Sequence, residues 1–278
     1  MIKLVAIDLD GTLFDNTSQV PKENQEAIQY MADHGIYPVV STGRPLDGIP
    51  DTVRALPFAY AITANGAGVY NLSTSECIFE GTMDADIALP ILDYLEDKHC
   101  NVDAFIQGTG VSTFKCQEHA DALALPPSLI KYVRDSRKRV DSLQDYITEN
   151  HLGVQKMTLN FFNDENGNAI DRPEIKEFLE SNPNVDVVCG GYNNLEFTRS
   201  GVSKGVGLTK LAEHLGLKIE ETMAIGDTEN DLSIIQTAGV SVAMANATEE
   251  IKEAADYITS SNEESGVAKA IHKFCIQE

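Results

Sequence analysis

Two aspartates, Asp8 and Asp10, follow directly on an apolar stretch near the start of the chain, within the run Asp8-Leu9-Asp10-Gly11-Thr12-Leu13. Residues 5–9 are typical of a short buried strand, and residues two apart in a strand share one face. We therefore expect both carboxylates on one face at the strand's C-terminal end, where open α/β sheets bind ligands. Two like charges so close are costly unless a cation or a shared proton relieves them, and oxygen-only ligation suits Mg²⁺. The pair thus predicts a magnesium site, with an ordinary Asp-Gly turn as the alternative.

Three further segments carry polar residues at the end of an apolar strand or at the start of a helix. Thr42, Gly43 and Arg44 follow the strand-like residues 37–41, and residues 226–231 follow the strand-like residues 222–225. Lys204 opens a helical pattern that has leucines on one face. Together these segments supply a nucleophile, metal ligands, a hydroxyl donor and a cation, which are the groups needed to transfer a phosphoryl group.

The motifs DLDGTL (8–13), STGR (41–44), GVSKG (201–205) and GDTENDL (226–232) resemble those of the haloacid dehalogenase superfamily of phosphohydrolases. The chain is most similar to the Cof-type branch, which residues 61–67 also resemble, and in which a large α/β cap is inserted after the third core strand. The resemblance implies an α/β fold with a Rossmann-like, doubly wound parallel-sheet core and an inserted α/β cap. It also implies a Mg²⁺-dependent phosphatase that hydrolyses small phosphorylated metabolites, such as sugar phosphates, through an aspartyl-phosphate.

The same resemblance implies a role for each matching residue. Asp8 is the expected nucleophile, and Asp10 is the expected general acid and base. Mg²⁺ would be bound by Asp8, by Asp227 and by the backbone carbonyl of Asp10, with Asp231 orienting these ligands. Lys204 is expected to be catalytic. The residues expected to bind the substrate or its phosphoryl group are Leu9, Thr42, Gly43, Arg44, Lys204 and Asn230, although Arg44 could instead pair with a carboxylate.

The order of apolar patterns predicts how the chain is divided. We expect residues 1–82 and 194–278 to form the catalytic core, because their motifs must meet in one sheet, and residues 83–193 to form the inserted cap that sets substrate specificity. Within the core, Pro21 suits the first position of a helix and Asn65-Gly66 predicts a hairpin. The basic run 131–139 in the cap is typical of a solvated helix face, with substrate recognition as the alternative.

Length and composition limit the possible number of domains, the cellular compartment and the kinds of partner. A chain of 278 residues is typical of about two domains, and its five scattered cysteines, without any C-x-x-C pair, favour a reducing compartment over a disulfide or zinc framework. The sequence contains neither a signal-peptide pattern nor a stretch long enough to span a membrane. We therefore predict a cytoplasmic protein without a membrane partner. The formal net charge of −22 disfavours nucleic acid as a partner, and the oligomeric state stays open.

Two other functions fit parts of this pattern. A phosphomutase or phosphotransferase on the same fold would return the phosphoryl group to a sugar instead of to water, and Asp10 fits either reaction. A phospho-receiver signalling module also uses aspartates at strand ends, a threonine and a lysine. Such a module would have about half the length of this chain and would not need a second domain.

Overall fold

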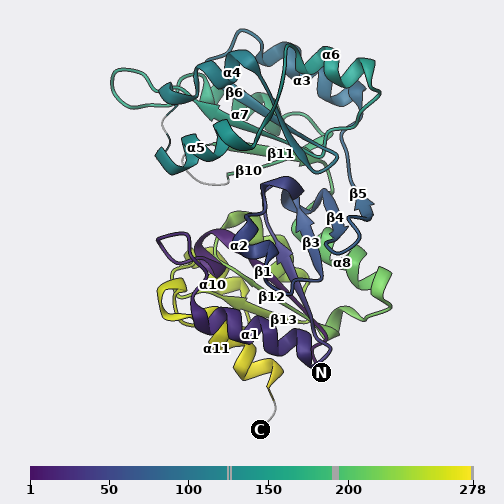
Figure 1. Ribbon diagram of the computed structural model, residues 1–278. Helices are drawn as coiled ribbons and strands as arrows, with labels where there is room; N and C mark the ends of the chain where they lie inside the picture. The colour runs from purple at the N-terminus through teal and green to yellow at the C-terminus, as the bar shows by residue number, and fades with distance from the viewer. Residues whose placement is uncertain (124, 126, 190–193, 277–278) are drawn as a thin grey trace. The chain divides into compact units, whose positions relative to one another are not determined.

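The computed structural model describes residues 1–123, 125, 127–189 and 194–276, and the chain divides into two compact units (Figure 1). The core unit combines Met1–Glu80 with Ser203–Glu278, and the inserted unit is Gly81–Val202. Each unit contains its own sheet and its own hydrophobic core. Both units combine helices with a sheet, so the predicted α/β class is confirmed.

The core unit is built on an eight-stranded sheet in which six neighbouring strands are parallel. In spatial order, its strands are β14 (Tyr257–Ile258), β13 (Val240–Ala243), β12 (Thr222–Gly226), β1 (Leu4–Asp8), β2 (Tyr37–Ser41), β3 (Tyr60–Thr63), β4 (Gly68–Asn71) and β5 (Cys77–Glu80). Strands β4 and β5 extend the sheet in antiparallel fashion. Every residue of β1 is buried, as expected for a central parallel strand that is covered on both faces. The carboxyl ends of β1, β2 and β12 therefore lie next to one another at one edge of the sheet.

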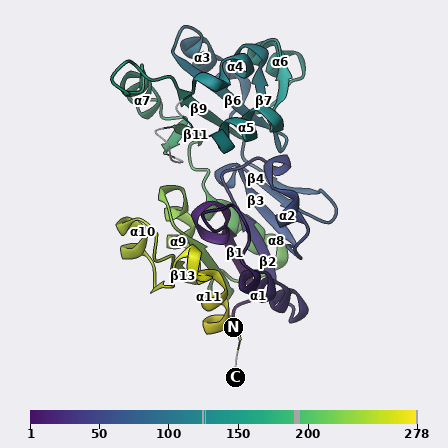
Figure 2. The ribbon, with the colours of Figure 1, turned by 60° about the vertical axis from the view of Figure 1, so that its left-hand side comes forward.

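Helices cover both faces of this sheet. They are α1 (Lys22–Asp33), α2 (Asp51–Arg54), α8 (Lys204–Leu215), α9 (Leu232–Thr237), α10 (Glu249–Ala254) and α11 (Gly266–Cys275). Figures 1 and 2 show α1 and α11 side by side on one face, whereas α8 packs against α9 and against β3 to β5. This is the doubly wound arrangement that the resemblance to the haloacid dehalogenase superfamily implies. Helix α1 begins one residue after Pro21, which occupies the position before the first turn.

The predicted hairpin at Asn65-Gly66 is confirmed, because β3 and β4 pair in antiparallel fashion on either side of the turn Ala64–Gly66. Both residues adopt a left-handed conformation, with φ of 55° at Asn65 and 96° at Gly66. A Cβ atom on Gly66 would lie 1.9 Å from the carbonyl oxygen of Ser203. Glycine at this turn therefore allows the segment that begins α8 to pack directly on the hairpin.

The inserted unit has a six-stranded sheet with one apolar and one polar face. In spatial order, its strands are β10 (Val185–Val188), β11 (Leu195–Arg199), β9 (Lys156–Phe161), β6 (Cys100–Ile106), β7 (Thr109–Thr113) and β8 (Lys138–Val140). Its helices are α3 (Ala85–Leu95), α4 (Phe114–Glu118), α5 (Pro127–Ser136), α6 (Leu143–Glu149) and α7 (Arg172–Glu180). Alternate residues of β6 show the two faces: Val102 and Ala104 join the apolar core with α3, α6 and α7, whereas Asn101 donates a hydrogen bond to the Cys116 carbonyl of α4. Among the helices that the structure describes, none has the length and apolar character needed to span a membrane.

Two details of the inserted unit differ from the sequence-based prediction. The predicted boundary at residues 193 and 194 places Leu195–Arg199 in the core, but this strand pairs with β9 and β10 in the second sheet. The basic run 131–139 was expected on one helix face, but α5 ends at Ser136 and β8 begins at Lys138. Arg137, between them, is buried because its guanidinium pairs with Asp103 on β6 at 3.0 Å.

Candidate active site

Three neighbouring strands of the core unit place the predicted catalytic segments at one edge of the sheet. Asp8 is the last residue of β1 and pairs with Ser41, so that Thr42 follows directly beside it at the end of β2. Ile7 pairs with Ile225 on β12, and Asp227 follows that strand. The strand register thus brings Asp8, Thr42 and Asp227 together from positions far apart in the sequence.

Lys204 is the first residue of α8, and its side chain is fully buried. Its Nζ atom lies 2.8 Å from Asp8 Oδ1 and 2.6 Å from Asp231 Oδ1. The helix starts at this point because Ser203 caps it, accepting a hydrogen bond from the backbone N–H of Val206. At Gly205, a Cβ atom would lie 2.5 Å from the Ser233 carbonyl oxygen, so glycine permits the close approach of α8 to α9.

The loop after β12 is folded around Asp231. The Oδ2 atom of Asp231 accepts hydrogen bonds from the backbone N–H groups of Asp227, at 3.0 Å, and of Thr228, at 3.3 Å. Asp227 in turn accepts a hydrogen bond of 3.0 Å from the hydroxyl of Thr12. Gly11, with φ of 84°, makes room for this carboxylate, since a Cβ atom there would lie 2.3 Å from Asp227 Oδ2. Asp231 therefore holds both the loop and Lys204 in place.

The buried charges of this cluster do not balance. One carboxylate oxygen from each of Asp8, Asp227 and Asp231 lies within 4.8 Å of the others, and all three residues are buried. Lys204 is the cation that contacts two of them. Three carboxylates and one ammonium group leave an excess of negative charge where a divalent cation with oxygen ligands would fit. The donor set therefore suits such an ion.

The pKa values of these groups reflect the same imbalance. Burial raises the pKa of Asp8 well above its usual range, and the charges of Asp231 and Asp227 add to this effect while Lys204 opposes it. Burial, together with the charge of Asp231, raises the pKa of Asp227 to about 7. For Lys204, burial alone would lower the pKa, but the charges of Asp231 and Asp8 outweigh it and raise the pKa. Lys204 is thus held protonated, whereas burial makes ionisation of the neighbouring Asp8 and Asp227 carboxyl groups unfavourable.

Asp10 lies apart from this cluster and pairs with Arg44. Its side chain is 60% exposed, whereas that of Arg44 is 17% exposed. The two groups form a bidentate contact, with Arg44 Nη2 2.7 Å from Asp10 Oδ1 and Arg44 Nε 2.9 Å from Asp10 Oδ2. Arg44 also donates a hydrogen bond to the Gly48 carbonyl. Of the two roles considered for Arg44, this structure displays pairing with a carboxylate.

The other residues expected at the phosphoryl group lie around the same edge of the sheet. Thr42 is buried, and its hydroxyl accepts a hydrogen bond of 3.2 Å from the backbone N–H of Arg44, which fixes the turn through Gly43. Asn230 donates a hydrogen bond of 3.3 Å to Asn65 Oδ1. The side chain of Leu9 is part of the hydrophobic core, so only its main chain could contact a phosphoryl group.

Two site residues received no role from the sequence. Thr12 bonds to Asp227, 215 positions away, and Asn65 contacts Asn230 across 165 positions. The backbone N–H of Asn65 also donates a hydrogen bond to the Thr42 carbonyl. Thr12 belongs to the first motif, and Asn65 lies within residues 61–67, which resemble the Cof-type branch and predict a turn at Asn65-Gly66. Because these contacts join residues so far apart in the sequence, no local pattern predicts the partner of either residue.

Comparison with known proteins agrees with this geometry. A sequence model of the haloacid dehalogenase-like hydrolases matches residues 5–271. The chain is 32% identical to the 5-amino-6-(5-phospho-D-ribitylamino)uracil phosphatase YcsE of Bacillus subtilis over 99% of this chain and 96% of that protein, and 31% identical to phosphatase YwpJ of B. subtilis over 96% and 98%.

Solved structures show the same likeness. A haloacid dehalogenase-like hydrolase from B. subtilis superposes with a TM-score of 0.84 at 29% identity, covering 99% of this chain and 100% of that one. The subclass IIB sugar phosphatase BT4131 superposes with a TM-score of 0.78 at 25% identity, covering 98% of each chain. The chain therefore belongs to the haloacid dehalogenase-like hydrolases, in their Cof-type branch, and is a phosphatase.

Proposed function

We propose that the protein is a Mg²⁺-dependent phosphatase that hydrolyses small phosphorylated metabolites through an aspartyl-phosphate on Asp8. The observation that carries this proposal is the position of the Asp8 carboxylate. It lies at the end of β1, 2.8 Å from the buried ammonium group of Lys204 and next to Asp227 and Asp231. A carboxylate nucleophile needs a neighbouring positive charge that neutralises the incoming phosphoryl oxygens, and Lys204 supplies one.

The reaction is proposed to run in two steps. An Asp8 oxygen forms a bond to phosphorus while the bond between phosphorus and the ester oxygen breaks, and Asp10 donates a proton to the departing alcohol. A water molecule then gives a proton to Asp10 and attacks the same phosphorus. Its attack breaks the bond to Asp8, so that inorganic phosphate leaves and both aspartates return to their starting state. Arg44 would orient Asp10 by keeping one of its two contacts while Asp10 carries the proton, and the bidentate contact would form again once Asp10 has given the proton up.

Mg²⁺ would be held by Asp8, Asp227 and the backbone carbonyl of Asp10, where it would neutralise charge on the phosphoryl oxygens. The chain's own donors would fix the remaining oxygens. We assign this role to the Thr42 hydroxyl, the Gly43 N–H, the Lys204 ammonium group and the Asn230 amide. Because the transition state spreads negative charge over these oxygens, positioned donors supply most of the expected rate enhancement.

For the substrate, we propose a phosphate ester of a sugar or of another polyhydroxylated chain. Two relatives are named as phosphatases of 5-amino-6-(5-phospho-D-ribitylamino)uracil, and BT4131 is described as a sugar phosphatase. These compounds share a phosphorylated carbon chain that carries hydroxyl groups. We further assign selectivity among such esters to the inserted unit.

The test is ³¹P NMR of the purified protein with Mg²⁺ and a panel of sugar phosphates together with 5-amino-6-(5-phospho-D-ribitylamino)uracil. We expect the ester signal to be replaced by that of inorganic phosphate. Appearance of an isomeric sugar phosphate without inorganic phosphate would instead identify a phosphomutase. The proposal would be contradicted if none of these esters, and not p-nitrophenyl phosphate either, released phosphate.

A further inference from the structure

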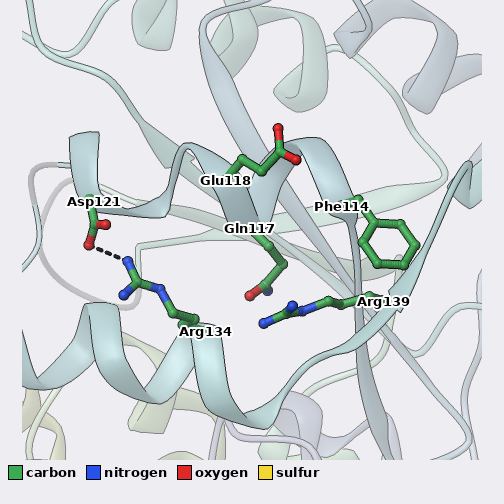
Figure 3. A pocket seen from close by; sticks show the side chains of 6 residues that line it. All are labelled: Phe114, Gln117, Glu118, Asp121, Arg134 and Arg139. Carbon is green, nitrogen blue, oxygen red and sulfur yellow. Dashed lines mark hydrogen bonds and ion pairs between the residues drawn. The ribbon is translucent and has the colours of Figure 1, made fainter.

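A pocket of about 330 Å³ lies within the inserted unit, between α4, the short 3₁₀ turn Ala120–Ala122, α5 and β8 (Figure 3). Its lining side chains are Phe114, Gln117, Glu118, Asp121, Arg134 and Arg139. Figure 3 shows the Gln117 amide and the Arg139 guanidinium pointing into this space, while Glu118 points away from it. Small-molecule sites typically have volumes of about 300–1,000 Å³, so the pocket can hold a small metabolite.

Arg139 is an exposed residue whose guanidinium points into this pocket. The basic run around it is otherwise matched to partners: Lys131 pairs with Asp135, Arg134 with Asp121, Arg137 with Asp103, and Lys138 bonds to the Tyr146 hydroxyl. Within the described residues, Arg139 has neither a hydrogen-bonded nor an ion-paired partner, although its charge acts on Asp135. An arginine fork without a carboxylate is suited to receive one from a ligand.

Gln117 and Phe114 add two further features. Gln117 is 6% exposed, and its Nε2 atom donates a hydrogen bond to the Val133 carbonyl at 3.4 Å. Its Oε1 atom is buried and accepts no hydrogen bond within the described part of the chain. An unsatisfied buried acceptor is unfavourable, so a donor on a ligand would be stabilising there. Phe114 is 47% exposed as a residue, and its ring offers an aromatic face beside the arginine.

From this set of groups, we propose that the pocket binds a small planar carboxylate that carries a hydroxyl or amino group. The carboxylate would pair with Arg139, the planar body would pack on Phe114, and the hydroxyl or amino group would donate to Gln117. Asp121 pairs with Arg134, and Glu118, the other acidic residue of the lining, points away from the pocket. Among the lining residues, Arg139 is therefore the cation that points into the space without an ion pair, and it matches a monoanion better than the dianion of a phosphate ester. The site is thus distinct in ligand chemistry from the phosphatase site, and its assignment uses none of the proposed catalytic residues.

The test is ¹⁹F NMR of the full-length protein with 4-fluoro-3-hydroxybenzoate as the probe. The fluorine resonance should broaden and shift saturably with the wild-type protein. Arg139→Gln should weaken binding about tenfold or more, the loss expected for a charge-assisted hydrogen bond. The matched control is Lys138→Gln, which removes the same charge from the neighbouring residue of β8. Lys138 bonds to the Tyr146 hydroxyl and does not line the pocket, so the affinity should stay within about twofold. The neutral 4-fluorobenzamide should not bind.

A second comparison tests Gln117. The hydroxylated probe should bind more tightly than 4-fluorobenzoate, and Gln117→Leu should abolish this difference. Absence of binding to the wild-type protein, or equal binding by wild type and Arg139→Gln, would overturn the proposal. Phosphate release by the same samples is measured in parallel. Loss of probe binding in Arg139→Gln with phosphate release retained would support a site separate from catalysis. Probe binding is measured without turnover, so the two proposals can fail independently of each other.

Discussion

Each unit of the protein buries a lysine against carboxylates, but only one of the two buried lysines belongs to a cluster with excess charge. In the core unit, Lys204 contacts Asp8 and Asp231, with Asp227 beside them. In the inserted unit, Lys156 on β9 is 1% exposed and lies 2.7 Å from Glu196 on β11. Both lysines would look alike on a burial criterion alone, so burial does not separate a reactive group from a structural one.

The balance of charge does separate them. On the polar face of the inserted sheet, Lys156 pairs with Glu196 and Arg137 with Asp103, one cation to one carboxylate. The Phe105 ring joins the two pairs, with Lys156 Nζ 4.7 Å and Arg137 Cζ 5.1 Å from its centroid. Within the described residues, these two pairs balance in charge, so they do not create the excess found in the core cluster. The core cluster has three carboxylates and one lysine, so an added cation would stabilise it, and we attribute its proposed reactivity to this excess of negative charge.

The largest expected effect is a loss of kcat that occurs on substitution of one buried aspartate, Asp8, but not of another, Asp103. Asp8→Asn should lower kcat by at least about 10⁴-fold, because it removes the proposed nucleophile and a metal ligand together. The matched change Asp103→Asn, on the polar face of the inserted sheet, should destabilise the protein while leaving kcat of the folded enzyme nearly unchanged. Release of phosphate from p-nitrophenyl phosphate and urea unfolding measure the two quantities. Activity of Asp8→Asn within about tenfold of wild type would exclude Asp8 as nucleophile.

The two lysines provide the second test. Lys204→Met should lower kcat/KM by about 10²–10³-fold for every ester, since it removes one preorganised donor to the shared phosphoryl group. Lys156→Met should instead cost about 3–5 kcal/mol of unfolding free energy, because it leaves the Glu196 carboxylate buried without this partner. Steady-state kinetics on several esters and denaturant unfolding are compared for both variants. The comparison fails if Lys156→Met impairs catalysis in the folded protein as much as Lys204→Met does.

A third test uses the exposed, balanced pair of the core, Asp10 and Arg44. If Arg44 orients Asp10 for proton transfer, Arg44→Met should slow hydrolysis of alkyl phosphates about tenfold or more, because their alkoxide leaving groups need a proton. Hydrolysis of p-nitrophenyl phosphate, whose leaving group needs little protonation, should change by less than about threefold. Arg54→Met is the matched control, since Arg54 donates to the Ile49 carbonyl in the same loop. Equal loss on both esters would show that Arg44 does not act through proton transfer.

The smallest expected effect is a dependence of metal stabilisation on pH. Asp227 has a folded-state pKa of about 7 against an ordinary value of 3.8. A carboxylate whose pKa is raised by folding binds its proton more tightly in the folded state, so the metal-free protein loses stability as pH rises from about 4 to 7. A divalent cation offsets this loss.

The increase in melting temperature between EDTA and saturating Mg²⁺ should therefore be larger at about pH 8 than at about pH 5.5. The difference should be roughly 2–4 °C for each kcal/mol of unfolding free energy that the metal-free protein loses between these two pH values. The variant Asp227→Asn should lose the part of this pH dependence that Asp227 contributes, and the part that remains is assigned to Asp8, whose pKa is also raised by burial. An increase that was independent of pH in the wild type, or larger at the lower pH, would contradict the charge imbalance as its cause.

Much of the core was predictable because its signals are local. Asp8, Thr42 and Asp227 each follow a short apolar strand, and parallel strands bring such ends together at one edge. The contact of Lys204 with Asp231 was not predictable from spacing, since it depends on how α8 packs against the loop after β12. Similarly, the alternation of Leu195–Arg199 indicates a strand but not which sheet it joins. The basic run 131–139 predicts a solvated position for Arg137, and the pattern cannot reveal the partner Asp103, which lies 34 positions away.

The central claim is that the excess negative charge of the core cluster must be neutralised by a divalent cation for phosphoryl transfer to occur. Its most direct test is the rate of phosphate release from p-nitrophenyl phosphate by protein treated with EDTA and then titrated with Mg²⁺. The account predicts no turnover in EDTA, saturable recovery with Mg²⁺, and little turnover with Ca²⁺, whose larger and looser coordination misplaces the nucleophile. Full activity in EDTA would contradict it.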